Sequence, residues 1–312
     1  MAHGTKDSKK PAKEPDRPGK PAAQPEPPEP PAPPAPPAGA ETGVAVRGKR
    51  GAQLTAEQLR SLLQIVPASD SVELKVTVPE SSLRSAVAAL QMDPLDAQIR
   101  QVFFFDTPDL AFDRAGVVVR ARRMQGKGGD TVVKLRPVVP QDLPADLRRS
   151  PAFVVEVDAM PGGFVCSGTL KNRVNPLEVR EAAAGRFPLR KLFTKQQRAL
   201  AAEHGPEGLD LDDLYVLGPI LVLKLPFFPS ALRQRLVAEM WLYPDGSRIL
   251  ELSTKCLPSD IGAVLADTQR FLDERGIDRS GDQQAKTKRA LTFFAKELQA
   301  ASAGKTEAAS GD

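Results

Sequence analysis

Charged residues recur on one face of the predicted strands of this sequence. In residues 71–78, SVELKVTV, Glu73 and Lys75 lie opposite Val72 and Leu74, because successive side chains of a strand point to opposite sides. A single strand of this kind usually lies at a protein surface with its charged face in solvent. The stretch alone therefore predicts a strand and does not identify a site.

The same alternation returns in most of the other predicted strands. Seven more strand segments follow, at residues 99–106, 117–123, 131–138, 153–158, 219–227, 233–243 and 247–255. Their charged faces carry neighbours such as Arg120 with Arg122, or Glu156 with Asp158. Apolar residues at helical spacing predict helices at 79–90, 177–185, 192–205, 259–276 and 282–300. Eight strands with few helices indicate an antiparallel sheet system or a barrel.

Two architectures satisfy this pattern. In a sandwich, the apolar faces form the core and every charged face is solvated. In a closed barrel, the charged faces point inward and helices cover the apolar faces outside. Periodicity alone favours the sandwich. An inward ring of Lys and Arg is costly when empty, but it suits a highly charged anion such as a triphosphate, with carboxylates holding a divalent metal beside it.

The first 52 residues differ from the rest in composition. Residues 11–40 are dominated by Pro, Ala and charge, which predicts a disordered Pro-rich tail over residues 1–52. This tail has nine basic and six acidic residues, so it holds +3 of the net charge of +4. The remaining 34 basic and 33 acidic residues nearly balance, which argues against a nucleic-acid-binding domain. We expect one domain over 53–300, with a helical insertion at about 161–217, and a disordered C-terminal tail over 301–312.

Cysteine, histidine and hydropathy patterns exclude several classes of protein. Cys166 and Cys256 lack CxxC spacing, so neither a disulfide framework nor a zinc site is predicted. With only His3 and His204, a histidine base or a histidine-rich metal site is not favoured. No apolar run approaches the roughly 20 residues that span a bilayer, and the N-terminus lacks a signal-peptide apolar core. We expect a cytoplasmic protein without a membrane partner, and the sequence does not indicate an oligomeric state.

Residues 103–123, FFFDTPDLAFDRAGVVVRARR, resemble the signature of the CYTH domain of the triphosphate tunnel metalloenzymes. In that family an aromatic residue is followed by DTPDL, then by RAG and a strand of the form LRxRR. The resemblance runs from Ser71 to about Cys256 and continues into the closing helices. It implies an α+β fold, an eight-stranded antiparallel β-barrel with flanking helices. It also implies that basic side chains of the tunnel bind a triphosphate-containing small molecule or polyphosphate, and that acidic ones bind Mg²⁺ or Mn²⁺.

The resemblance also assigns roles to individual residues. The implied phosphate contacts are Lys75, Arg120, Arg122, Lys134, Arg136, Lys224 and Arg235. The implied metal ligands are Glu73, Glu156, Asp158, Glu239 and Glu251. Among these, Lys75, Arg122 and Glu251 are the implied catalytic residues.

Two positions depart from the family pattern. The family's first strand usually reads ExExK, whereas Ser71 stands here in place of the leading carboxylate, and Ser253 stands where a second acid often follows Glu251. Both changes remove anionic ligands and weaken the expected metal site. The favoured function is metal-dependent hydrolysis of an inorganic or organic triphosphate. The alternatives are a non-catalytic module that binds triphosphate or polyphosphate, and an adenylate cyclase.

Overall fold

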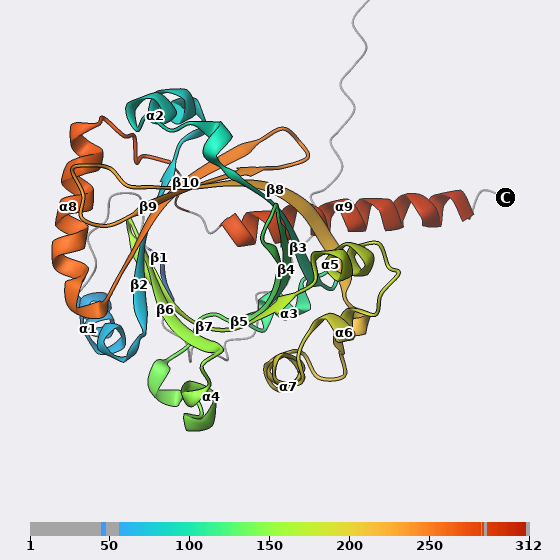
Figure 1. The fold of residues 1–312 in the computed structure, drawn as a ribbon. Coiled ribbons are helices and arrows are strands. Elements are labelled where there is room, and N and C mark those ends of the chain that lie inside the picture. Colours follow the sequence, from blue (N-terminus) through green and yellow to red (C-terminus); the bar gives the residue numbers. More distant parts are fainter. Residues whose placement is uncertain (1–44, 48–55, 282, 284–285, 310–312) are drawn as a thin grey trace, which may run out of the picture. The chain divides into compact units, whose positions relative to one another are not determined.

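The protein is built on a sheet that closes on itself, with most helices outside it (Figure 1). The computed structural model describes residues 45–47, 56–281, 283 and 286–309, all of which belong to the unit formed by residues 40–312. The strands are β1 (Ala45–Arg47), β2 (Ser71–Val78), β3 (Gln98–Asp106), β4 (Val117–Met124), β5 (Gly128–Leu135), β6 (Phe153–Met160), β7 (Gly163–Val174), β8 (Tyr215–Phe227), β9 (Leu236–Leu242) and β10 (Arg248–Cys256).

Helices connect the strands and close the chain. The α-helices are α1 (Ala56–Ile65), α2 (Leu83–Ala89), α3 (Ala111–Arg114), α4 (Ala145–Arg149), α5 (Pro176–Ala183), α6 (Leu189–Leu192), α7 (Lys195–His204), α8 (Ile261–Glu274) and α9 (Lys286–Ala309). Short 3₁₀ helices lie at Val66–Ala68, Glu80–Ser82, Pro94–Asp96, Pro140–Asp142, Leu211–Asp213 and Pro258–Asp260. No helix among the described residues is long and apolar enough to cross a bilayer.

The sheet forms a closed barrel, which confirms the second of the two predicted architectures. Among the described residues, nine strands form the ring in the order β7, β5, β4, β3, β8, β9, β10, β2 and β6, and β6 pairs with β7 to complete it. The expected count of eight antiparallel strands was wrong in two respects. The ring has a ninth strand, and β2 pairs with β6 in parallel register, so the barrel is mixed.

The additional strand is β7, which lies within the predicted helical insertion at 161–217. Its sequence, GFVCSGTLKNRV, is rich in small and polar residues and gave no clear strand pattern. The helices expected at 177–185 and 192–205 within that segment are present as α5 and α7. Gly168 illustrates why small residues occur here, since a Cβ atom at this position would lie 2.4 Å from Cζ of the buried Phe153 on β6.

The apolar faces of the strands point outward and are covered by helices. On one side, Val119 of β4 and Val133 of β5 share a core cluster with Val179 of α5 and Leu200 of α7. On the other, residues of β2, β9 and β10 pack with α2 and α8, as in the cluster that joins Leu250 to Phe271. These contacts leave the charged faces directed to the barrel interior.

One end of the interior is apolar, and α9 packs against it. Cross-strand register places Val102 and Phe104 of β3 on the same face as Arg122 and Arg120, which is the inward face. The core cluster that contains these two residues and Trp241 of β9 also contains Ala290, Leu291 and Phe294 of α9. In Figure 1, α9 starts within the outline of the barrel and runs out beyond its wall. This helix therefore covers one mouth of the barrel.

Both predicted tails overlap described elements. Most of the predicted tail at residues 1–52 lies outside the described residues, but residues 45–47 form β1 on the edge of β7. Helix α9 extends to Ala309 and so includes much of the predicted C-terminal tail.

We predict that Gly168→Ala destabilises the protein by about 1–3 kcal/mol, because the added methyl group would overpack the site against Phe153. Urea unfolding of the full chain measures the difference. Gly262→Ala is the matched control, since nothing lies within 4 Å of the Cβ position at Gly262 in α8 and the helix propensity of Ala exceeds that of Gly. Equal stability of the two variants would contradict the close approach of β7 to Phe153.

Candidate functional site

Asp158 of β6 is the acidic centre of the barrel interior. Its side chain is completely buried, and Lys75 Nζ lies 2.8 Å from Oδ1. Lys134 Nζ and Arg136 Nη2 each lie 3.5 Å from Oδ2. Burial by itself would raise the pKa of Asp158, but Lys134, Lys75 and Arg136 together lower it well below its usual value. Asp158 therefore remains ionised and gathers three basic side chains around one carboxylate.

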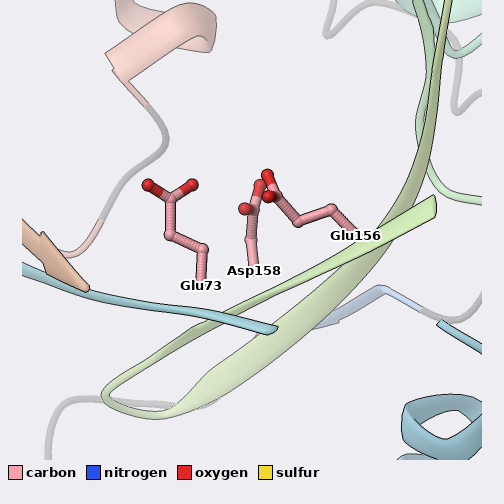
Figure 2. A group of neighbouring side chains, drawn as sticks. All are labelled: Glu73, Glu156 and Asp158. Carbon is pink, nitrogen blue, oxygen red and sulfur yellow. The ribbon is translucent and has the colours of Figure 1, made fainter. Parts of the chain in front are cut away.

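Glu73 of β2 and Glu156 of β6 complete a group of three carboxylates with Asp158. One oxygen from each residue lies within 4.8 Å of the others. Figure 2 shows the three side chains extending to the same side of β2 and β6. The parallel register accounts for this arrangement, because Glu73 is the direct partner of Asp158 across the two strands. Glu156 also accepts a hydrogen bond from Ser71 at 3.3 Å and is paired with Lys255.

The donor set of this group fits a hard divalent cation. Carboxylate oxygens are the ligands that Mg²⁺ and Mn²⁺ prefer. Both oxygens of Asp158 are buried and face Lys75, Lys134 and Arg136, so a metal ion bound there would share this carboxylate with three cations. Burial opposes the charge of Glu73, but Lys75 and Lys255 lower the pKa of Glu73 below its usual value, so this carboxylate is also ionised.

Glu239 of β9 and Glu251 of β10 form a second acidic pair, which is held by lysines. The two residues are direct antiparallel partners, so their like charges require a neighbouring cation. Lys286 of α9 supplies it: Nζ lies 2.7 Å from Glu251 Oε1, bonds Glu239 as well, and sits 5.1 Å from the centre of the Trp241 ring. Lys224 Nζ lies 2.9 Å from Glu239 Oε1. These oxygens are therefore already engaged by the protein's own cations.

Arg122 of β4 is fixed by a buried carboxylate. Its Nε and Nη2 donate to the two oxygens of Asp130 at 2.8 and 2.7 Å, in the bidentate geometry that arginine and carboxylate groups favour. Asp130 also lies 3.2 Å from Lys171 Nζ. Burial would raise the pKa of Asp130, but the hydrogen bonds and charge of Arg122 lower it to about 2. Asp130 thus orients one guanidinium of the interior.

Arg120 lacks such a partner. No ion pair joins it to an acidic residue of the described chain, and its Nε is buried without a hydrogen bond. Burial and the neighbouring positive charge of Arg122 lower the pKa of Arg120 to about 9. Burial likewise lowers the pKa of Lys134 and of Lys224, in spite of the nearby acids. The interior therefore places several cations where a bound anion would stabilise them.

The structure brings most of the sequence-predicted residues together on the inward face. These are Lys75, Arg120, Arg122, Lys134, Arg136 and Lys224 among the basic residues, and Glu73, Glu156, Asp158, Glu239 and Glu251 among the acidic ones. Arg235 is the exception. Strand β9 begins at Leu236, and Arg235 lies exposed just before it, with no ion pair to a described site residue.

Three residues of the site were not identified from the sequence. Lys255 pairs with Glu156, and its position two residues after Ser253 on the same face was a usable signal. Asp130 lies one residue before the strand predicted at 131–138, so its inward direction was not visible. Lys286 lies on a helix that follows the barrel, and no strand periodicity marks it.

Asp106 and Thr107, in the DTP part of the signature at residues 103–123, have a structural role. The Asp106 carboxylate is buried and accepts hydrogen bonds from the backbone N–H groups of Thr107, Phe112 and Asp113 at 2.7–2.9 Å. The Thr107 hydroxyl accepts another from the Ala111 N–H at 2.8 Å. These bonds satisfy the start of α3, which connects β3 to β4. The motif thus fixes the turn that leads into the strand of Arg120 and Arg122.

Comparison with solved structures supports the fold assignment. No family model matches the chain, and no curated protein matches it in sequence. A proposed adenylyl cyclase from Hippeastrum, whose structure report describes a dominant triphosphatase activity, aligns with 71% of this chain and 95% of its own at 16% identity, with a TM-score of 0.52. The two chains share a fold. A proposed adenylate cyclase from Bacillus halodurans aligns over 71% of this chain and 97% of its own, at 14% identity and a TM-score of 0.49.

We predict that Asp130→Asn destabilises the protein by about 2 kcal/mol at pH 7, the free energy that corresponds to a pKa lowered from 3.8 to about 2. The native pKa lies below the unfolded one, so this stabilisation is present above pH 3.8 and is lost as the pH falls toward 2. The difference in free energy of unfolding between variant and parent, measured by urea unfolding, should be smaller at pH 3 than at pH 7. The exposed Asp142→Asn serves as control, and a gap independent of pH would contradict the ion pair.

Proposed function

We propose that the barrel binds the triphosphate group of a small molecule or of polyphosphate and hydrolyses its terminal phosphoryl group, as a member of the CYTH family of tunnel proteins. Three observations support this proposal: the signature at residues 103–123, the closed barrel with inward charges, and the fold shared with the Hippeastrum protein. The resemblance supplies the reaction type, because a fold by itself does not determine function.

The observation that carries the proposal is Arg120, which has no ion pair with an acidic residue of the described chain and whose buried Nε lacks a hydrogen-bond partner. A buried cation without an anion costs free energy, and such groups are retained where a ligand neutralises them. Phosphoryl oxygens fit this role, because arginine forms charge-assisted hydrogen bonds with phosphate. Arg122, Lys134 and Lys75 also lie on the inward face of the barrel.

The proposed metal ligands are Glu73, Glu156 and Asp158, with Mg²⁺ or Mn²⁺ as the ion. A divalent cation held there would neutralise and orient phosphoryl oxygens. Side chains of the protein would supply the other catalytic interactions. Lys75 and Arg122 stabilise the charge that develops on the phosphoryl oxygens, and Glu251 orients the attacking water. In hydrolysis the water oxygen bonds to the terminal phosphorus, the bridging P–O bond breaks with its electron pair on the leaving phosphate oxygen, and the proton lost by the water passes to the phosphate products or to solvent.

One observation favours the alternative of a non-catalytic binding module. Ser71 and Ser253 replace two expected acids, and Lys286 occupies oxygens of both Glu239 and Glu251. Fewer carboxylates are thus free for metal than the family pattern implies. Triphosphate binding without phosphate release in Mg²⁺ or Mn²⁺ would support this alternative over the hydrolase.

We predict that Arg120→Met weakens binding of inorganic triphosphate by about 1.5–3 kcal/mol, the value of a hydrogen bond to a charged group. The same change should leave the stability of the ligand-free protein equal or increased, because it removes an unneutralised buried charge. Isothermal titration with triphosphate and urea unfolding measure the two effects. Phosphate release in Mg²⁺ should fall in parallel with affinity.

Arg149→Met on the exposed surface of α4 is the matched control and should change neither affinity nor stability. Loss of stability in Arg120→Met with unchanged affinity would show that Arg120 is a structural residue and would contradict the proposed site.

A further inference from the structure

The outer wall of the barrel has an apolar face, centred on β8, that none of the described helices covers. This β8 face consists of five side chains that cross-strand register places next to one another: Ile99 of β3, Leu221 and Leu223 of β8, and Met240 and Leu242 of β9. Lys224 and Glu239 alternate with them along the strands and point inward, so the five side chains point outward. The β8 face is therefore separate from the charged interior.

The side chains of the β8 face are only partly removed from solvent. Ile99 is 42% exposed and Leu221 is 40% exposed. Leu223 and Leu242 are partly buried but belong to none of the three core clusters of the described residues. Strands β3 and β8 lie on the part of the wall between α5, which covers β4, and α2, which packs with β9 (Figure 1). Helix α9 packs with inward-facing residues of β3 and β8, so it does not cover this outer face.

The two sides of the β8 face carry opposite charge. On the β4 side, Arg123 has a buried Nε without a hydrogen-bond partner, and Lys127 is exposed in the turn that follows β4. On the opposite side, Asp245 is exposed in the turn that joins β9 to β10, and Arg248 is paired with Glu80. No ion pair joins Lys127 or Asp245 to another residue of the described chain. The face is thus basic along one side and acidic along the other.

We propose that the β8 face is the interface of a two-fold symmetric dimer, with the same face of a second copy of this chain as its occupant. In such a dimer each side of the face meets the opposite side of its partner. Lys127 of one copy therefore pairs with Asp245 of the other, and the pair occurs twice across the axis. The apolar centre is buried between two sheets that pack face to face. The inference concerns assembly and does not depend on the proposed function.

The pattern of charge favours a second copy over a partner of a single charge. An anionic partner, such as a nucleic acid or a membrane surface, would be attracted at Lys127 and repelled at Asp245. A face that is apolar at its centre and oppositely charged along its two sides is complementary to itself. Two further exposed side chains enlarge the apolar area: Leu95 before β3 is 92% exposed, and Phe228 after β8 is 75% exposed. They lie at the same end of the face, because the start of β3 pairs with the end of β8.

The first test measures the mass of the full chain by sedimentation equilibrium. As concentration rises from micromolar to tenths of millimolar, the mass of the parent should approach twice the chain mass of 33.6 kDa. Leu221→Glu places a charge at the centre of the interface and should raise the dissociation constant of the dimer at least about tenfold. Leu63→Glu is the matched control, because Leu63 is 67% exposed on α1, outside the β8 face. The control should form dimers as the parent does.

The second test reverses the charges at the sides of the face, where substitution does not disturb a core. Lys127→Glu alone and Asp245→Lys alone each place like charges at both contacts, and each should raise the dissociation constant roughly five- to thirtyfold. When the two variants are mixed in equal amounts, both contacts of the mixed dimer join opposite charges. Mixing should therefore restore association to near the parent affinity.

Three results would overturn the inference. The first is a parent that remains monomeric up to tenths of millimolar. The second is a dimer that Leu221→Glu leaves intact or that Leu63→Glu disrupts, which would place the interface elsewhere. The third is a pair of charge variants whose association mixing does not restore, which would contradict the two-fold arrangement. Each result would leave the proposed function standing, because that function is tested on triphosphate binding by Arg120 in the interior.

Discussion

The structure depends on the way a small number of carboxylates hold many cations inside one barrel. Asp158 is the strongest case, since it is buried and lies between Lys75, Lys134 and Arg136. Removing one partner of such a buried group leaves uncompensated charge, which typically costs several kcal/mol. Asp130 does the same for Arg122, and Glu239 for Lys224 and Lys286. Like-charged neighbours such as Arg120 and Arg122 are tolerated within the barrel because these acids lie among them.

The two ends of the interior differ, and this difference gives the tunnel a direction. At one end Phe104 and Trp241 pack with Leu291 of α9, while Lys286 at the start of that helix reaches Glu239 and Glu251. At the other end the wall carries charged and polar residues. A helix packed against apolar side chains excludes water from its end, which strengthens the electrostatic interactions nearby. An anion that enters from the charged end would therefore meet progressively less solvated cations.

Much of this arrangement was predictable from the sequence, and the limits have physical causes. Side chains of a strand alternate between its two faces, so the sequence predicted that Glu73 and Lys75 share one face of their strand. It predicted the same of Arg120 and Arg122. The alternation does not say whether such a face points inward or outward. Periodicity did not decide between a closed barrel and a sandwich, since both satisfy the same pattern. The family resemblance favoured the barrel. The ninth strand escaped detection because Gly168 and its small neighbours serve close packing and show little strand propensity.

Other site residues could not be found because tertiary structure positions them. Lys286 reaches the interior only because α9 folds back on the barrel, and no local signal encodes that contact. Asp130 follows two glycines and lies one residue before the strand predicted at 131–138, although β5 in fact starts at Gly128. Arg235 was predicted to be a site residue because it shares the period of two with Glu239. Strand β9 begins only at Leu236, however, and the Arg235 side chain lies at the surface.

The net charge of the barrel interior depends on two serines, Ser71 and Ser253, and on two lysines that the sequence did not predict, Lys255 and Lys286. Ser71 contributes a hydroxyl donor to Glu156 where the family has an acid, and Ser253 lies directly opposite Lys75 across the strands. Two negative charges are thereby missing from the interior, while Lys255 and Lys286 pair with the acids that remain. Under the proposed function, a metal ion would compete with these lysines for carboxylate oxygens. A phosphate chain would relieve that competition by offering the lysines other acceptors, so anion and metal would favour each other's binding through reciprocal coupling.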